Sequence, residues 1–419
     1  MKVVLIGTMY PPYAFGGAEK AIATLAEALV RAGVKVVVVT LHSGAMEEIE
    51  ERNGIRIYHL PLDNIYWPFT QQIKPNALLR TVWHLREVWN GKAAGRVGRI
   101  LDLEAPEVVH THNINGFSVA IWRAVKRRGI RLVHTLHDYY LLCPRTTLYR
   151  RGEVCENRCI GCQLLTANRK AASWMPDEIV SVSGFALAKH KHFGYFPDVR
   201  SRVIDNIHPI NAPAVRVESP RQESHVLRFG FIGRIEPEKG IETLLRATRQ
   251  LIQPEWRLRI AGKGTEGYVT SLRGEYPDDR IEWLGFTTAP SFYGSVDVVV
   301  IPSHWDEPLG YVCVESLHEG KPIICARAGG LPEIARLSNV VEHFQAGSAE
   351  ELARLMNAAL SDPIKWRRNL LPASAALDRF TGQAVVAKYL AVYRSEAEPV
   401  TLTREESRKT IAHRSELGA

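Results

Sequence analysis

The stretch His304-Trp-Asp-Glu-Pro-Leu-Gly-Tyr-Val-Cys-Val-Glu315 decides the fold, because it joins a strand pattern to a helix pattern. The apolar run Val296–Ile301 before it predicts a buried parallel strand. Pro308 is placed as the first residue of a helix over Leu309–Glu319, where a backbone N–H is not needed. The free N–H groups around Gly310 and Tyr311 would then form an anion site at the helix N-terminus.

Two carboxylates, Glu307 and Glu315, lie on either side of Gly310. Glu307 would stand at the mouth of the anion site, and Glu315 lies about two helical turns further along. Carboxylates accept hydrogen bonds from hydroxyl groups, so the stretch predicts a ligand that combines a phosphate with a polyol. Two solvated glutamates on an ordinary strand–helix unit are the alternative interpretation.

The length and composition indicate a globular protein of two domains. The chain has 419 residues, of which 46% are hydrophobic and 23% charged. No apolar run approaches the roughly 18 residues that cross a bilayer, and Met1–Gly7 enters a strand pattern without a signal-peptide core. Six cysteines are too few for a disulfide framework. The sequence therefore predicts a cytoplasmic protein.

The formal net charge of +8 favours anionic partners. The chain has no zinc finger with paired histidines and no basic–aromatic repeat, so we expect no nucleic-acid partner. An anionic lipid surface on the inner face of the cell membrane and simple solubility both remain as explanations of the charge.

Strand and helix patterns alternate along both halves of the chain, which predicts an α/β fold with two doubly wound, Rossmann-like domains facing across a cleft. We expect domains over 1–210 and 225–378, with a polar linker at 211–224. A closing helix at 379–395 is expected to return to the first domain, and a charged tail follows at 396–419. The predicted strands are Val3–Ile6, Val36–Val39, Glu107–His112, Arg131–Thr135, Glu178–Ser183, Phe229–Gly233, Arg257–Ala261, Ile281–Leu284, Val296–Ile301 and Pro322–Ala326.

A second motif, Gly233-Arg234-Ile-Glu-Pro-Glu-Lys239-Gly240, begins the second half after the strand Phe229–Gly233. Arg234 can donate two parallel hydrogen bonds to one phosphate, and Lys239 supplies a mobile positive charge. Together they would stabilise the charge that grows on a leaving diphosphate. The alternative is a surface ion pair of Arg234 with Glu236 or Glu238.

These two motifs resemble those of retaining glycosyltransferases of family 4 (glycosyl transferases group 1), which have the GT-B fold. The resemblance covers roughly residues 1–395 and is strongest from Phe229 to Ile334. It implies transfer of a hexose from a UDP- or GDP-linked donor with retention of configuration, in envelope polysaccharide biosynthesis, and no metal for catalysis. Glu307 would bind the transferred sugar and Glu315 the ribose.

Other positions carry the same resemblance more weakly. The pattern His110-Thr-His112 follows a strand, and the resemblance gives His112 a catalytic role. His137 and Asp138, which close the next strand, would lie on the acceptor side. The resemblance also implies a donor-binding set of Gly16, Gly17, Gly233, Arg234, Lys239, Gly262, Phe286, Glu307, Leu309, Gly310, Tyr311 and Glu315.

Two other functions remain open on the same fold. A nucleotide-sugar 2-epimerase would bind only the donor and would show no dependence on an acceptor. A catalytically silent nucleotide-sugar-binding partner of an assembly complex would bind without turnover. A dinucleotide-dependent dehydrogenase is disfavoured, because neither half has Gly-x-Gly-x-x-Gly after its first strand.

An arginine-rich insertion at 143–165 contains the cysteines Cys143, Cys155, Cys159 and Cys162. Cys159 and Cys162 have the spacing of metal ligands, and Cys143 and Cys155 would complete a tetrahedral set. The insertion has few aliphatic residues, so a metal would supply folding free energy. The sequence predicts structural zinc, with an iron–sulfur cluster or plain reduced thiols as alternatives.

Aromatic and basic residues of the first half suggest a lipid-linked acceptor and a peripheral position at the membrane. The aromatics are Tyr66-Trp-Pro-Phe69, Trp83 and Trp89, and the cations are Arg123, Lys126, Arg127 and Arg128. Such residues together suit a membrane interface. Buried aromatics and an ordinary solvated helix face are the alternative.

Overall fold

The computed structural model describes residues 1–13, 16–69, 75–208, 226–367 and 374–396, and it divides into two compact units. The first unit comprises Met1–Leu148, Cys155–Pro209 and Phe380–Ala419. The second comprises Tyr149–Val154 and Ile210–Arg379, so a short piece of the cysteine-containing insertion groups with it. The predicted linker 211–224 and the predicted tail beyond residue 396 lie outside the described residues.

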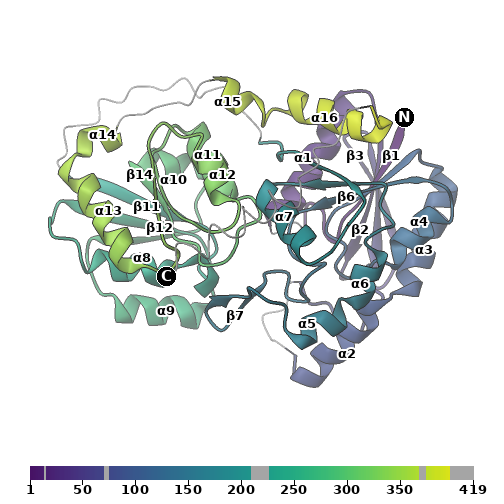
Figure 1. The fold of residues 1–419 in the computed structure, drawn as a ribbon, viewed down its shortest axis with the longest axis horizontal. Helices are drawn as coiled ribbons and strands as arrows, with labels where there is room; N and C mark the ends of the chain where they lie inside the picture. Colours follow the sequence, from purple (N-terminus) through teal and green to yellow (C-terminus); the bar gives the residue numbers. More distant parts are fainter. Residues whose placement is uncertain (14–15, 70–74, 209–225, 368–373, 397–419) are drawn as a thin grey trace. The chain divides into compact units, whose positions relative to one another are not determined.

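Within its described residues, the first unit has an eight-stranded sheet in the order β10-β9-β6-β5-β1-β2-β4-β3 (Figure 1). Neighbouring strands are parallel except β3 with β4. Strands β1 and β2 are apolar along nearly their whole length, as a sheet covered on both faces requires. The strands are β1 (Lys2–Ile6), β2 (Lys35–His42), β3 (Glu48–Arg52), β4 (Ile55–Pro61), β5 (Val108–Thr111), β6 (Arg131–Leu136), β9 (Glu178–Ser181) and β10 (Arg200–Val203).

Helices cover both faces of this sheet. On one face α1 (Gly17–Arg31) lies beside α16 (Gly382–Arg394), and both contribute to one buried apolar cluster with alternate strand residues (Figure 1). The strand residues in between point to the opposite face of the sheet. On that face, Thr111 accepts a hydrogen bond from Trp122 of α4. The remaining helices of the unit are α2 (Ala77–Val88), α3 (Gly91–Glu104), α4 (Ala120–Lys126), α5 (Ile160–Leu165), α6 (Ala167–Ala172) and α7 (Gly184–His192).

The second unit repeats the plan with a six-stranded sheet in its described part, all parallel, in the order β13-β12-β11-β14-β15-β16. Its strands are β11 (Leu227–Ile232), β12 (Trp256–Ala261), β13 (Ile281–Gly285), β14 (Val298–Ile301), β15 (Ile323–Ala326) and β16 (Val341–Phe344). Its helices are η1 (Pro237–Lys239), α8 (Ile241–Thr248), α9 (Glu266–Glu275), α10 (Ala289–Ser295), α11 (Tyr311–His318), α12 (Leu331–Ala335), α13 (Ala349–Ser361), α14 (Pro363–Arg367) and α15 (Ser374–Asp378). A separate hairpin is formed by β7 (Tyr149–Arg150) and β8 (Glu153–Val154).

Two doubly wound α/β units confirm the predicted fold class. The predicted closing helix is α16, and its contacts with α1 place it in the first unit, as expected. In the second sheet, strands β11 to β15 were predicted to within two residues at each end, because their apolar runs are continuous. Strands β3, β4, β10 and β16 were not predicted.

Candidate functional site

Glycines follow two central strands of the second unit at their carboxyl ends, and at one of them, Gly262, the backbone is packed too closely for a side chain. Gly233 follows β11 and Gly262 follows β12, and both have positive φ angles, of 156° and 139°. A Cβ on Gly262 would lie 1.8 Å from the Gly233 carbonyl oxygen. The structure thus brings these two predicted donor-site glycines into direct contact.

Lys239 and Glu307 form the centre of this strand-end region. The Lys239 Nζ donates to Glu307 Oε1 at 2.5 Å, and the Ser303 hydroxyl donates to the same oxygen at 2.7 Å. Burial would raise the Glu307 pKa, but the Lys239 charge and the hydrogen bonds around the carboxylate lower it instead. Glu307 is therefore an anion that is paired with the Lys239 cation, and such a pair suits a polar ligand.

The helix after Glu307 begins later than the sequence predicted. Helix α11 starts at Tyr311, with Gly310 as its N-cap at φ 85°, so Pro308 is not its first residue. The left-handed conformation of Gly310 is what separates Pro308 from the helix. A Cβ on Gly310 would lie 2.3 Å from the Leu331 side chain, so glycine is required here on two grounds. The first backbone N–H of the helix still follows Gly310.

Arg234 does not contact Lys239 or Glu307 in the hydrogen bonds of the described residues. Its guanidinium pairs with Glu236 at 2.9 Å and with Glu238 at 3.5 Å, and its side chain is 53% exposed. The surface ion pair considered as an alternative is therefore present. An exposed pair of this kind contributes little to stability, so ligand binding can replace it at small cost.

Two other predicted donor residues lie apart from Lys239. Glu315 on α11 accepts a hydrogen bond from the Tyr293 hydroxyl at 2.8 Å. Phe286 is well exposed just after β13, with the Lys263 ammonium 5.3 Å from its ring centre. Ser303 and Tyr293 had not been predicted, because each is recognisable only by its hydrogen bond to a carboxylate, Glu307 for Ser303 and Glu315 for Tyr293.

The first unit gathers histidines where β5 and β6 end. His112 Nδ1 lies 2.9 Å from His137 Nε2, and the two rings stack. His112 is buried, which lowers its pKa well below the ordinary value, so its ring is neutral. His112 Nε2 has no hydrogen-bond partner among the described residues. His110 instead contacts α16, through a 2.8 Å hydrogen bond with Tyr393.

Two buried carboxyl groups lie near this histidine cluster. Burial raises the pKa of Asp138 to about 7, although the Tyr140 N–H donates to it. Burial also raises the pKa of Glu19, which stands against Gly16 at the start of α1. A Cβ on Gly16 would lie 2.6 Å from the Glu19 carboxylate, and Gly17 is the first residue of the helix. Glu19 is a third site residue that had not been predicted.

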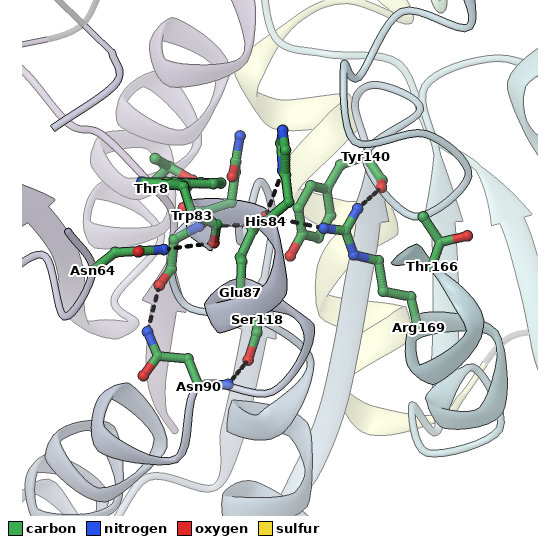
Figure 2. Close-up of polar contacts among 12 residues, drawn as sticks. Thr8, Asn64, Trp83, His84, Glu87, Asn90, Ser118, Tyr140, Thr166 and Arg169 are labelled. Atoms are coloured by element: carbon green, nitrogen blue, oxygen red, sulfur yellow. Dashed lines mark hydrogen bonds and ion pairs between the residues drawn. The ribbon is translucent and has the colours of Figure 1, made fainter. Parts of the chain in front are cut away.

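A buried ion pair supports the segment that follows Asp138. Arg169 of α6 reaches Glu87 of α2 at 3.0 Å, and it also donates to the Tyr140 carbonyl (Figure 2). Glu87 accepts a further hydrogen bond from the Gly116 N–H at 2.9 Å. Breaking such a pair leaves a buried charge without a partner, which typically costs about 3–5 kcal/mol. Helices α2 and α6 are thereby fixed to the loop beyond β6.

The aromatic residues of the membrane prediction differ in their exposure, and Trp89 is exposed whereas Trp83 is not. Trp83 is only 3% exposed, and Trp67 packs edge-on against Phe69. The basic side chains Lys126 and Arg128 are engaged in ion pairs with Asp177 and Asp102. The exposed apolar residues of α2 are Leu78, Leu79 and Leu85, which had not been predicted, and the predicted Trp89 follows directly after the helix.

No helix in the described parts of the chain is long and apolar enough to cross a membrane. In the same residues, no group of three or more His, Cys, Asp or Glu side chains is arranged so that it could hold a metal ion.

Comparison with known families gives a consistent picture for both halves. Residues 16–207 match the glycosyl transferase 4-like domain, and residues 218–374 match the glycosyl transferases group 1. The chain is 33% identical over 337 residues to an uncharacterized 42.6 kDa protein in the cps region of Klebsiella pneumoniae, covering 80% of this chain and 88% of that protein. It is 26% identical to a D-inositol 3-phosphate glycosyltransferase of Thermobifida fusca, covering 71% of each.

Solved structures resemble the fold over nearly the whole chain. Sucrose-phosphate synthase of Thermosynechococcus elongatus has a TM-score of 0.74 at 20% identity, covering 94% of this chain and 98% of that one. HepE of Anabaena in complex with UDP has a TM-score of 0.69 at 20% identity, covering 94% of this chain and 100% of that one. These similarities show the GT-B fold.

Proposed function

Because the chain belongs to the group 1 glycosyl transferases, we propose that it transfers a hexose from a nucleoside-diphosphate sugar to an acceptor hydroxyl with retention of configuration. The observation that carries the proposal is the contact between Lys239 and Glu307 at the strand ends of the second unit. A cation for phosphate and a carboxylate for sugar hydroxyls stand together there. The similarity to a structure holding UDP supports a uridine donor.

In this proposal Lys239 and Arg234 bind the diphosphate. Arg234 would exchange its partners Glu236 and Glu238 for phosphate oxygens, which accept its planar donor group better. Lys239 would shift from Glu307 toward the phosphate, leaving Glu307 to accept hydrogen bonds from the sugar. Positive charge beside the leaving diphosphate lowers the barrier, so catalysis needs no metal ion.

The donor would extend along the strand ends toward Glu315 and Phe286. Glu315 is proposed to bind the ribose, and the loop at Phe286 to face the base. Gly233, Gly262, Leu309, Gly310 and Tyr311 complete the proposed donor site through their backbone.

The histidine cluster of the first unit is the proposed acceptor side. His112 is neutral and its Nε2 is without a partner in the described residues, so it can bind a sugar hydroxyl there. Asp138, with its pKa of about 7, changes charge near neutral pH and can accept a proton from an acceptor. His137 fixes the ring orientation of His112. Gly16 and Gly17 would approach both substrates through the start of α1.

We propose a lipid-linked acceptor and a peripheral position on the inner face of the cell membrane. Support comes from α2, where Leu78, Leu85 and Trp89 fall on one side of the helix and are exposed. Arg80 and Arg86 are exposed on the same helix. Apolar and basic side chains together favour an anionic lipid interface.

The proposed reaction is tested by turnover with nucleotide-sugars and sugar-bearing lipids. A thermal-shift screen first identifies the donor, and the product's anomeric configuration is then measured by NMR. Acceptor-dependent release of nucleoside diphosphate with a retained anomer is expected. Isomerised donor without an acceptor would indicate the 2-epimerase, and nucleotide binding without turnover would indicate the silent partner. A Glu307→Gln variant should still bind the bare nucleotide while turnover falls.

A further inference from the structure

The cysteine-containing insertion brings its thiols together in the first unit. Cys143 follows the loop after β6, Cys155 follows the β7–β8 hairpin, and Cys159 and Cys162 lie at the start and middle of α5. None of them forms a disulfide. The catalytic proposal above gives these side chains no role.

The distances between the thiols suit a shared metal. Cys143 Sγ lies 3.6 Å from Cys162 Sγ, and the Cys159 thiol also hydrogen-bonds to Cys162. In a tetrahedral zinc site each sulfur is ~2.3 Å from the metal, so two sulfurs lie ~3.8 Å apart. The Cys143–Cys162 spacing is therefore close to one edge of such a tetrahedron, and it is far longer than a disulfide bond.

The backbone around Cys143 is shaped to support a metal-bound sulfur. The N–H groups of Arg145 and Leu148 both hydrogen-bond to the Cys143 sulfur. They can do so because the chain turns sharply, with positive φ angles at Thr146 and Leu148. Hydrogen bonds of this kind orient a ligand and offset its negative charge.

The insertion has little other means of holding its structure. Helix α5 has no buried residue, and its apolar side chains Ile160 and Leu164 are largely exposed. Arg158 ties the segment to its surroundings through the Leu142 carbonyl and Thr166. Arg145 and Arg158 also place positive charge beside the thiols, which suits a site with four thiolates.

We propose that Cys143, Cys159 and Cys162, with Cys155 as fourth ligand, bind one structural Zn²⁺. Binding releases four thiol protons and leaves a tetrathiolate with net charge −2. Side-chain rotations of Cys155 and Cys159 are required, since no three ligand side chains of the described residues are arranged to hold a metal ion. Zinc is favoured over an iron–sulfur cluster because the 3.6 Å between the Cys143 and Cys162 sulfurs fits two ligands of a single metal.

The test is the metal content of the full-length protein purified without chelator. About one zinc per chain is expected in the wild type, and less than about one-tenth in Cys143→Ser/Cys162→Ser. Cys313→Ala is the matched control, because Cys313 is buried in the second unit and should leave the zinc content unchanged. Zinc below one-tenth in the wild type, zinc retained in the double variant, or iron in its place would overturn the proposal.

A second variant tests the proposal even if the double variant fails to fold. Cys159 is exposed, so Cys159→Ser should fold with its metal bound more weakly. Competition with a chromophoric chelator should extract zinc from it at least tenfold more readily than from the wild type. Cobalt added to the zinc-free wild type should give the visible spectrum of tetrahedral thiolate ligation, and an octahedral spectrum would contradict the proposed ligands.

Discussion

At the scale of single residues, the two cations of the proposed donor site differ in their surroundings. Lys239 neutralises a buried carboxylate, whereas the exposed Arg234 side chain pairs only with the half-buried Glu236 and Glu238. Replacing Lys239 would therefore change both the turnover and the stability, because Glu307 would be left buried without its partner. Arg234 is the cleaner position at which to measure charge stabilisation of the leaving group.

Arg234→Ala should lower kcat by about 10²–10³, since one preorganised charge-stabilising donor is lost. Its melting temperature should stay within error of the wild type, because exposed ion pairs contribute little. Steady-state kinetics and a thermal melt check both statements. Lys365→Ala, which removes another exposed cation of the second unit, should leave kcat unchanged. A wild-type kcat for Arg234→Ala would rule out the diphosphate role.

Asp138 should make the stability of the protein depend on pH. Burial raises its folded pKa from 3.8 to about 7, so the folded state favours the neutral acid. Its stabilising contribution is complete below about pH 4 and is lost as the pH rises through 7. Relative to Asp138→Asn, the wild type should thus lose unfolding free energy between pH 5 and about pH 8. Parallel denaturant titrations measure this, and a pH-independent difference would contradict the raised pKa.

At the scale of the elements, the strand ends were more predictable than the contacts that they make. Continuous apolar runs indicated β1, β11 and β14, and glycines follow β1 and β11 directly. Strand β3 has the exposed, charged sequence Glu-Ile-Glu-Glu-Arg, so periodicity could not reveal it at the sheet edge. The start of α11 was misplaced because the sequence does not show that Gly310 adopts a left-handed conformation.

Contacts across the fold were the least predictable part of the site. The pairing of Lys239 with Glu307 joins residues 68 positions apart. Motif spacing suggested that both act on one ligand, but only the sheet order places β11 next to β14. Glu19 and Ser303 lie close in sequence to Gly16 and Glu307 but complete no motif that predicts the contact, and Tyr293 is recognisable only by its distant partner Glu315.

The glycine turn at Gly262 should tolerate no side chain. Gly262→Ala would place a Cβ 1.8 Å from the Gly233 carbonyl oxygen, so the turn between β12 and α9 must move. Gly285→Ala is the matched control, because its φ is also positive but nothing lies within 4 Å of the added Cβ. The control should cost about 1–2 kcal/mol of backbone strain. Gly262→Ala should destabilise clearly more in urea unfolding and also weaken UDP binding; equal costs would contradict the close packing.

The exposed face of α2 should bind anionic lipid. Leu78 and Leu85 are 72% and 58% exposed, so Leu78→Ser/Leu85→Ser should leave folding nearly unchanged. Sedimentation with anionic vesicles should fall several-fold in this variant, because its apolar contact with the interface is lost. Ile252→Ser, at an equally exposed apolar site in the second unit, should bind like the wild type. Equal binding of both variants, or equal binding to neutral vesicles, would contradict the lipid surface.

At the scale of the whole molecule, each of the two compact units is built from segments that are not continuous in the sequence. The first unit is completed by α16, which follows the whole of the second unit in sequence. Arg131 donates to the Val392 carbonyl, and His110 bonds to Tyr393 across 283 positions. The first unit therefore cannot finish folding until the end of the chain is available.

This arrangement predicts that a mutation near the C-terminus damages the first unit and spares the donor site. Val392 is fully buried in the cluster formed by α1, α16 and the first sheet. Val392→Ala removes two carbon atoms and leaves a cavity, which should cost about 2–3 kcal/mol. Calorimetry should show the loss as a lower unfolding temperature. UDP affinity, measured by titration well below that temperature, should remain at the wild-type value because the proposed donor residues belong to the second unit. A parallel loss of UDP affinity would show that α16 also supports the donor site.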